Sequence, residues 1–256
     1  MRIRTGVYWP AAAGCGRNQD SLSLQHVMLQ KGECLLAAVC DGIGSLARSE
    51  EASGYAVHCM TDWFYHEGKE LICGNSSKEH ILLALQRRLC HMQEHLKEFQ
   101  KTEQIQTGTT LSALFLSRGR YYLIHIGDSR IYRIRKRTIP IKRQLYHTRC
   151  LTTDDRTPEG CLLKCMGMAG ADRAILQTGR IRKGTVFLLC TDGFYYGNDA
   201  KRLGQVLGPL LAEKSGWRTL SDPAEHQMNR RLELLGIEAQ KAGSRDNMAA
   251  IAVCIY

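Results

Sequence analysis

Four aspartates in this sequence stand at the ends of apolar runs. Asp41, Asp128 and Asp192 each follow a run of strand length, and Asp246 comes just before one. If these strands are neighbours in space, their carboxylates converge. Converging carboxylates repel one another and raise one another's pKa values, so such a cluster is normally tolerated only with cations present. Ligands that are all oxygen select hard divalent ions such as Mg²⁺ or Mn²⁺.

Two of these aspartates are followed directly by glycine, at Gly42 and Gly193. Asp-Gly is a common turn dipeptide, and either pair taken alone indicates a turn rather than a metal ligand. Four strand-end acids together are harder to explain by turns. A glycine after the acid also lets a backbone carbonyl approach a metal closely. The pattern therefore leaves turns and a divalent metal site as the two interpretations.

Hydrophobic periodicity predicts the elements that must position these acids. Apolar residues at three- and four-residue steps predict a helix over 78–102, and further helices are expected over 50–66 and, as a pair, within 199–241. Strands are predicted over 2–8, 21–29, 33–40, 110–117, 120–126, 130–135, 174–180, 185–190 and 248–256. Strands in runs with helices in pairs predict an α+β fold, with sheets inside and helices outside.

Three of the predicted strands follow one another closely. They are joined by Arg118–Gly119 and by Gly127–Asp128, which are typical turn dipeptides. The spacing predicts an antiparallel meander of these three strands. The stretch from 136 to 173 is expected to be loop.

The bulk composition predicts one domain over residues 1–256. An apolar fraction of 44% can fill a substantial core. The longest apolar runs are strand-sized, well short of the ~20 residues that a membrane-spanning helix needs, and no secretory signal follows the basic N-terminus. Eleven cysteines, several of them inside apolar strand patterns, are typical of reduced thiols. We expect a cytoplasmic protein that does not associate with a membrane.

The net charge of +10 raises the question of a nucleic-acid partner. The basic residues are spread along the chain, with one concentration over 130–143 that alternates with apolar residues. Such alternation is typical of a strand with one solvated face. We therefore expect no nucleic-acid partner, and an acidic, phosphorylated protein would suit the same positive surface.

Five short motifs resemble, in order and spacing, those of the metal-dependent protein phosphatases, the type 2C family. They are Asp41-Gly42-Ile43-Gly44, Gly108-Thr109-Thr110, Gly127-Asp128-Ser129-Arg130, Cys190-Thr191-Asp192-Gly193 and Gly243-Ser244-Arg245-Asp246-Asn247. The resemblance covers nearly the whole chain, and the apolar Ile43 is similar to bacterial members. It implies a β-sandwich of two antiparallel sheets flanked by pairs of helices, in α-β-β-α layers.

The resemblance also implies a role for each acid. Asp41 matches the carboxylate that bridges two metal ions, with the carbonyl of Gly42 on one of them. Asp192 and Asp246 match the remaining direct ligands. Asp20 matches an acid that holds metal-bound waters, and Asp128 matches a ligand of a third, weaker ion.

The implied activity is hydrolysis of phosphoserine or phosphothreonine on proteins, the substrates of a serine/threonine kinase. Two divalent cations, Mn²⁺ or Mg²⁺, would activate a water that attacks phosphorus directly. Asp41, Asp192 and Asp246 would be catalytic through that metal-bound water, and no protein nucleophile is needed.

The chain departs from the family pattern at several positions. Cys15 stands where the family usually has an arginine for substrate phosphate, and Arg17 is the nearest candidate for that role, although it can equally face solvent. Gln19 replaces a glutamate, which would weaken metal affinity. Tyr196 stands where many members have an acid for the third ion, and the substrate flap near 154–162 is short.

These departures motivate two alternatives. One is a catalytically weakened phosphatase-like module that binds or regulates, and the other is a hydrolase of small phosphoesters. The three direct-ligand acids argue for activity. A His-x-x-Glu-His pattern at 91–95 suggests a zinc peptidase, but both histidines flank the apolar stripe of a predicted helix, which is typical of surface residues. Asp154 and Asp155 are interpreted as ordinary loop charges.

Overall fold

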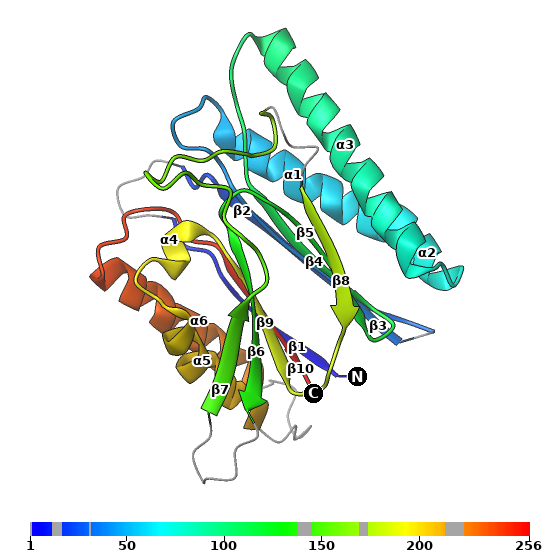
Figure 1. Cartoon of the computed structure of the whole chain (residues 1–256), viewed down its shortest axis with the longest axis vertical. Helices are drawn as coiled ribbons and strands as arrows, with labels where there is room; N and C mark the ends of the chain where they lie inside the picture. Colours follow the sequence, from blue (N-terminus) through cyan, green and yellow to red (C-terminus); the bar gives the residue numbers. More distant parts are fainter. Residues whose placement is uncertain (1, 12–16, 31, 138–144, 169–173, 213–222) are drawn as a thin grey trace.

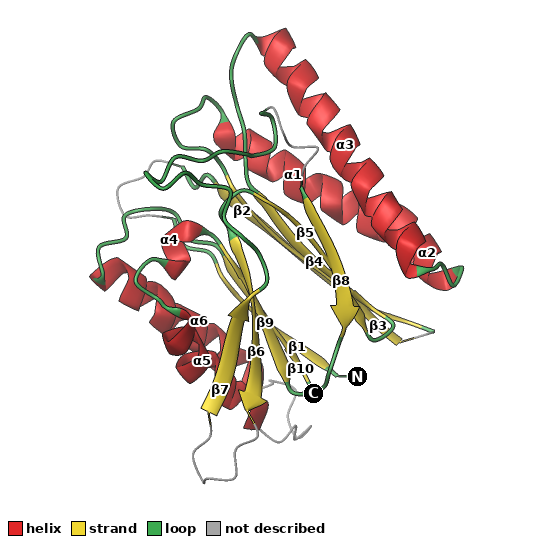
Figure 2. Ribbon diagram, viewed as in Figure 1, coloured by secondary structure: helices red, strands yellow, loops and turns green. Residues whose placement is uncertain are grey.

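The computed structural model of the chain describes residues 2–11, 17–30, 32–137, 145–168, 174–212 and 223–256. Within them, two five-stranded antiparallel sheets pack face to face, and helices cover both outer faces (Figures 1 and 2). The α+β class and the α-β-β-α layering expected from the sequence are confirmed. No helix among the described residues is long and apolar enough to cross a membrane.

One sheet has the strand order β1-β10-β9-β6-β7 and the other has the order β2-β3-β4-β5-β8. The first consists of β1 (Ile3–Tyr8), β10 (Ala250–Ile255), β9 (Thr185–Cys190), β6 (Arg130–Arg137) and β7 (Leu145–Cys150). The second consists of β2 (Asp20–Leu29), β3 (Gly32–Asp41), β4 (Leu111–Ser117), β5 (Arg120–Ile126) and β8 (Ile175–Arg180). The chain therefore builds both sheets from segments far apart in sequence.

The helices pack in two groups. The outer face of the second sheet is covered by α1 (Ser49–Trp63), the π-helical turn Phe64–Gly68, α2 (Lys69–Cys73) and α3 (Lys78–Glu103). The first sheet is covered by α5 (Ala200–Leu207), the 3₁₀ turn Gly208–Ala212 and α6 (Pro223–Lys241). A single short turn of helix, α4 (Asp192–Tyr195), follows β9.

The central strands are buried on both faces. In β3, Leu35 packs between the sheets while its neighbour Leu36 packs against α1 and α3. In β9, Phe187 and Leu188 divide in the same way between the inner core and the helices α5 and α6. A strand covered on both faces is apolar at every position, which explains why these segments read as continuous apolar runs.

The predicted meander is wrong at its second turn. β4 and β5 form a hairpin, but β6 pairs with β7 and β9 in the other sheet. The dipeptide Gly127–Asp128 is therefore a crossover between sheets. Gly127 has φ 105°, and a Cβ there would lie 2.6 Å from Cγ2 of Thr110, so the crossover requires glycine.

Strand β7 lies in the stretch for which the sequence predicts a loop. Its sequence is Leu-Tyr-His-Thr-Arg-Cys, and His147 and Arg149 are exposed while Tyr146 packs against the core beside α5. As the edge strand of its sheet, β7 buries too few apolar side chains to give a clear pattern. The basic alternation over 130–135 is confirmed as a strand, β6, which extends to Arg137.

Candidate metal and active site

Four of the five predicted acids line one cavity of about 170 Å³. Asp41 is the last residue of β3, Asp128 lies in the crossover between the sheets, Asp192 opens α4, and Asp246 lies in the turn before β10. The elements that carry them meet beside α4, at one end of the sandwich (Figure 1). The fifth acid, Asp20, is the first residue of β2 and pairs in register with Asp41.

At two glycines beside the acids, the backbone is packed too closely for any side chain. A Cβ on Gly42 would lie 2.6 Å from the carbonyl oxygen of Ser49, and a Cβ on Gly193 would lie 2.1 Å from that of Asn247. Because Gly193 has no side chain, the end of β9 can lie directly against the segment before β10. Gly193 therefore lets Asp192 and Asp246 come together, and Gly42 lets the end of β3 lie against Ser49, so each Asp-Gly pair has a packing reason.

The acids are close enough to perturb one another. Burial, and then the charges of Asp20 and Asp192, hold the pKa of Asp41 well above its ordinary value. Burial raises the pKa of Asp20 to about 7, and the charges of Asp246 and Asp192 add to this effect while a hydrogen bond from Thr191 opposes it. Burial and the charge of Asp192 also raise the pKa of Asp246. The sequence-based expectation of converging, mutually repelling carboxylates agrees with this arrangement.

The donor set fits a hard divalent cation. Oδ1 of Asp192 is buried and has no hydrogen-bond partner within the described residues, so it is an acceptor without a donor. Among the described residues, no group of three or more aspartate, glutamate, histidine or cysteine side chains is arranged to hold a metal ion by itself. Protein oxygens supplemented by water are what Mg²⁺ and similar ions take, since these ions keep several of their waters.

Two threonines, neither assigned a role from the sequence, orient the acids. Thr191 Oγ1 donates to Asp20 Oδ2 at 2.7 Å and accepts from the backbone N–H of Ala249 at 2.9 Å. Thr110 Oγ1 accepts from the backbone N–H of Asp41 at 2.9 Å. Both lie within the family motifs quoted above, but the motifs alone did not indicate which acid each one contacts.

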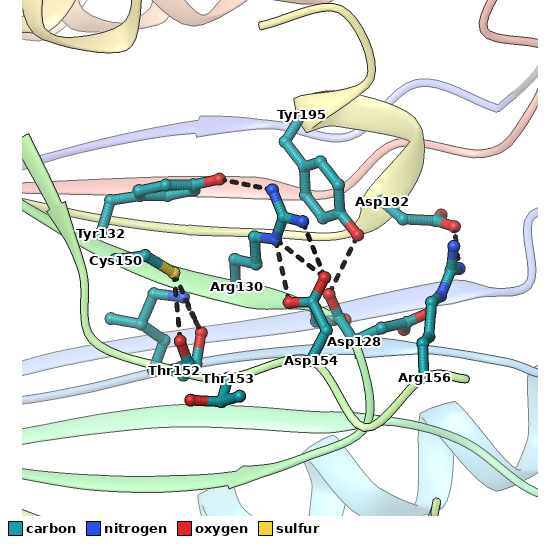
Figure 3. Close-up of polar contacts among 12 residues, drawn as sticks. Asp128, Arg130, Tyr132, Cys150, Thr152, Thr153, Asp154, Arg156, Asp192 and Tyr195 are labelled. Atoms are coloured by element: carbon teal, nitrogen blue, oxygen red, sulfur yellow. Dashed lines mark hydrogen bonds and ion pairs between the residues drawn. The ribbon is translucent and has the colours of Figure 1, made fainter. Parts of the chain in front are cut away.

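Arg156 is the residue of the cavity that the sequence did not reveal. Its Nε donates to Asp128 Oδ2, and its Nη2 donates to Asp192 Oδ2 at 2.6 Å (Figure 3). It lies in the short segment near 154–162, far in sequence from both acids. No local pattern marks it, because the ion pairs exist only once the sheets have assembled.

The interpretation of Asp154 and Asp155 as ordinary loop charges is wrong. The guanidinium of Arg130 donates to both carboxylate oxygens of Asp154, with the shortest distance at 2.7 Å, and lies 3.9 Å above the ring of Tyr195 (Figure 3). Asp155 accepts from Lys164 Nζ at 2.6 Å and from the backbone N–H of Gly127. Both acids hold the loop against the crossover that carries Asp128.

Arg17 does not reach the acids. Its side chain is 78% exposed, and its Nη1 donates to Glu50 Oε1 at 2.8 Å. An adjoining cavity of about 480 Å³ shares Asp192 and Asp246 with the first and is also lined by Tyr196, and Arg17 lines neither cavity. Its contact with a substrate phosphate stays a prediction.

Comparisons with known proteins agree with the fold. The serine/threonine phosphatase of S. agalactiae matches with a TM-score of 0.73 at 18% identity, over 100% of both chains. Stp1 from Staphylococcus aureus matches with a TM-score of 0.73 at 19% identity, over 100% of this chain and 96% of that one. The catalytic domain of the phosphatase PstP, in complex with two manganese ions, matches with a TM-score of 0.68 at 21% identity. The match covers 99% of this chain and 98% of that one.

A search of curated protein sequences finds no significant match. The family model described as protein phosphatase 2C matches residues 16–234, which is most of the sequence. The chain therefore belongs to the protein phosphatase 2C family.

Proposed function

We propose that the chain is a metal-dependent serine/threonine protein phosphatase that uses two divalent cations, Mn²⁺ or Mg²⁺. The carboxylates of Asp41, Asp192 and Asp246 and the carbonyl of Gly42 would hold the cations, with Asp20 acting from behind Asp41. The observation that carries the proposal is the convergence of these acids on one cavity in a chain of this family. We further propose phosphorylated proteins, the products of a serine/threonine kinase in the cytoplasm, as substrates.

When bound, the cations make a water acidic enough to lose a proton, so that it can attack phosphorus. They also supply positive charge that stabilises the phosphoryl oxygens. The chain's own residues hold the carboxylates in place for this. Thr110 fixes the backbone of Asp41, and Thr191 fixes one oxygen of Asp20. Pre-oriented ligands of this kind avoid the cost of ordering them when the ion or the substrate arrives.

A protein nucleophile is not part of the proposal. Cys190 lies next to the site in sequence, but its side chain is fully buried in β9 among apolar residues of the sheet and of α5 and α6. Burial holds the pKa of the Cys190 thiol well above its ordinary value. A thiol that stays protonated is a poor nucleophile, which favours attack by water.

A phosphatase-like module without turnover is the second candidate. It is favoured by Arg17, which pairs with Glu50 instead of pointing to the acids, and by the cysteine at position 15. Both functions use the same fold and acids, so only an activity measurement separates them.

The test is an assay of the purified protein on a phosphothreonine peptide and on an aryl phosphate, with and without Mn²⁺. Asp192→Asn keeps the shape of the side chain and removes its charge, so it is the matched control for metal-dependent turnover. We expect Mn²⁺-dependent hydrolysis of the peptide and a loss of roughly a hundredfold or more in Asp192→Asn. Turnover of that variant within about tenfold of the wild type would overturn the assignment.

A further inference from the structure

Asp128 is the most enclosed carboxylate of the cavity and has a protein cation of its own. Its side chain is 4% exposed, and within the described residues its only ion-pair partner is Arg156. A buried carboxylate without a counter-charge is strongly unfavourable, so we expect the ion pair with Arg156 to stabilise the folded protein. The same guanidinium also pairs with Asp192, whose side chain is 21% exposed.

The two acids share the arginine in a specific way. Arg156 contacts Oδ2 of Asp192, while Oδ1 of that carboxylate is buried and has no partner among the described residues. Asp192 thus offers one oxygen to the guanidinium and keeps the other free for a cation held with Asp41 and Asp246. By contrast, an ion placed between Asp128 and Asp192 would need the position that Arg156 already fills.

The segment that carries Arg156 is folded to hold it there. A β-bridge joins Arg156 to Leu162 and closes a short loop, in which the backbone N–H of Thr157 donates to the carbonyl of Cys161 at 2.8 Å. The backbone N–H of Asp155 donates to the carbonyl of Gly127, also at 2.8 Å. Arg156 is therefore anchored to the same crossover that carries Asp128.

We propose that Arg156 is a tethered cation that takes the place of a third divalent ion at Asp128. The inference rests on the proposed function, in which the remaining acids hold two cations. It assigns Asp128 to the arginine and not to a metal, in contrast to the role expected from the family resemblance. The loaded protein then carries two divalent ions and one guanidinium.

The number of bound ions tests this directly and does not depend on turnover. Equilibrium dialysis against MnCl₂, followed by metal analysis, counts Mn²⁺ per chain in four proteins. We expect two ions in the wild type, a third and weaker ion in Arg156→Gln, and two again in Arg156→Gln/Asp128→Asn. Lys164→Gln removes one positive charge from the same segment, but Lys164 pairs with Asp155 and lines neither cavity, so it should keep two.

Thermal unfolding supplies a second readout. In EDTA, Arg156→Gln leaves Asp128 buried without its counter-charge, so its Tm should fall, and added Mn²⁺ should raise that Tm by more than it raises the wild-type Tm. If Arg156→Gln does not fold without metal, Arg156→Lys takes its place in the experiment. Lysine keeps the positive charge but cannot contact both acids in the same way. It should then bind more Mn²⁺ than the wild type.

The failures of the two proposals are distinguishable. A wild-type protein that binds no Mn²⁺ would overturn the proposed function and this inference with it. Three ions in the wild type, or two in both the wild type and Arg156→Gln, would overturn the inference alone and leave the phosphatase assignment standing.

Discussion

Thr191 and Asp20 are 171 positions apart in the sequence, and a hydrogen bond of 2.7 Å joins their side chains. Thr191 follows β9 of one sheet, and Asp20 begins β2 of the other. The bond therefore connects the two sheets at the end of the sandwich where the acids converge. Since the Thr191 hydroxyl also accepts from the backbone N–H of Ala249, one side chain positions β2, β9 and β10 together.

Thr191→Val should destabilise the protein by about 1–3 kcal/mol, because it leaves a buried backbone N–H and a buried carboxylate oxygen without their partner. Valine keeps the shape, so packing changes little. Urea unfolding in EDTA measures the difference. Thr178→Val is the control, since that hydroxyl donates to the carbonyl of Tyr121 on β5, outside the acid cluster, and should cost less. Equal costs for the two variants would contradict a special role for Thr191.

Arg17→Ala tests whether an exposed arginine binds substrate phosphate. If it does, the variant should raise KM for a phosphopeptide more than it lowers kcat, since ground-state binding is lost. Glu50→Gln is the matched variant, because it frees Arg17 from its ion pair and should not raise KM. Unchanged kinetics in Arg17→Ala would return this residue to the role of a solvated surface charge.

The acids should make the stability of the metal-free protein depend on pH. Burial raises the pKa of Asp20 from its ordinary 3.8 to about 7, so between these values the folded state holds a proton that the unfolded chain has released. This contribution to stability is full below about pH 4 and is lost as the pH rises through about 7. The slope is on the order of 1 kcal/mol per pH unit.

Urea unfolding in EDTA at several pH values measures this slope. Asp20→Asn removes the titrating group and should flatten the curve over that window. The slope due to Asp20 is the difference between the slopes of the wild type and Asp20→Asn, because Asp41 and Asp246 also have raised pKa values and contribute in both proteins. The same slope in both proteins would show that Asp20 does not titrate as its burial indicates.

The strands that deliver the acids were predictable, because their burial on both faces leaves a continuous apolar run. β3 and β9 appear in the sequence as such runs, and Asp41 and Asp192 stand at their ends. The family motifs then identified the acids as one set. What these segments share is that their structure follows from their own residues.

The crossover at Gly127 and the position of Arg156 were not predictable in this way. Gly-Asp between two strands is as good a hairpin turn as a crossover, and the choice depends on Thr110 and on a partner sheet formed by distant segments. Arg156 looks like any loop arginine until Asp128 and Asp192 come together around it. Tertiary contacts decide both cases.

The strongest check of the site is whether a cation stabilises the protein through Asp41 more than through Asp20. Asp41 lines the cavity, whereas Asp20 is 2% exposed behind it and already accepts from Thr191. Added Mn²⁺ should raise the Tm of the wild type, since an ion that binds the folded state stabilises it by mass action.

This rise in Tm should largely vanish in Asp41→Ala and only shrink in Asp20→Ala. Removing a residue that supports a ligand lowers metal affinity by about 10–100-fold, and removing a direct ligand lowers it further. Asp62→Ala is the control. That acid pairs with Arg88 on the surface between α1 and α3, so its loss should leave the Mn²⁺ effect intact. If Asp41→Ala kept the full rise, the convergent carboxylates would not be the cation site, and the proposed phosphatase mechanism would lose its physical basis even though the family assignment stood.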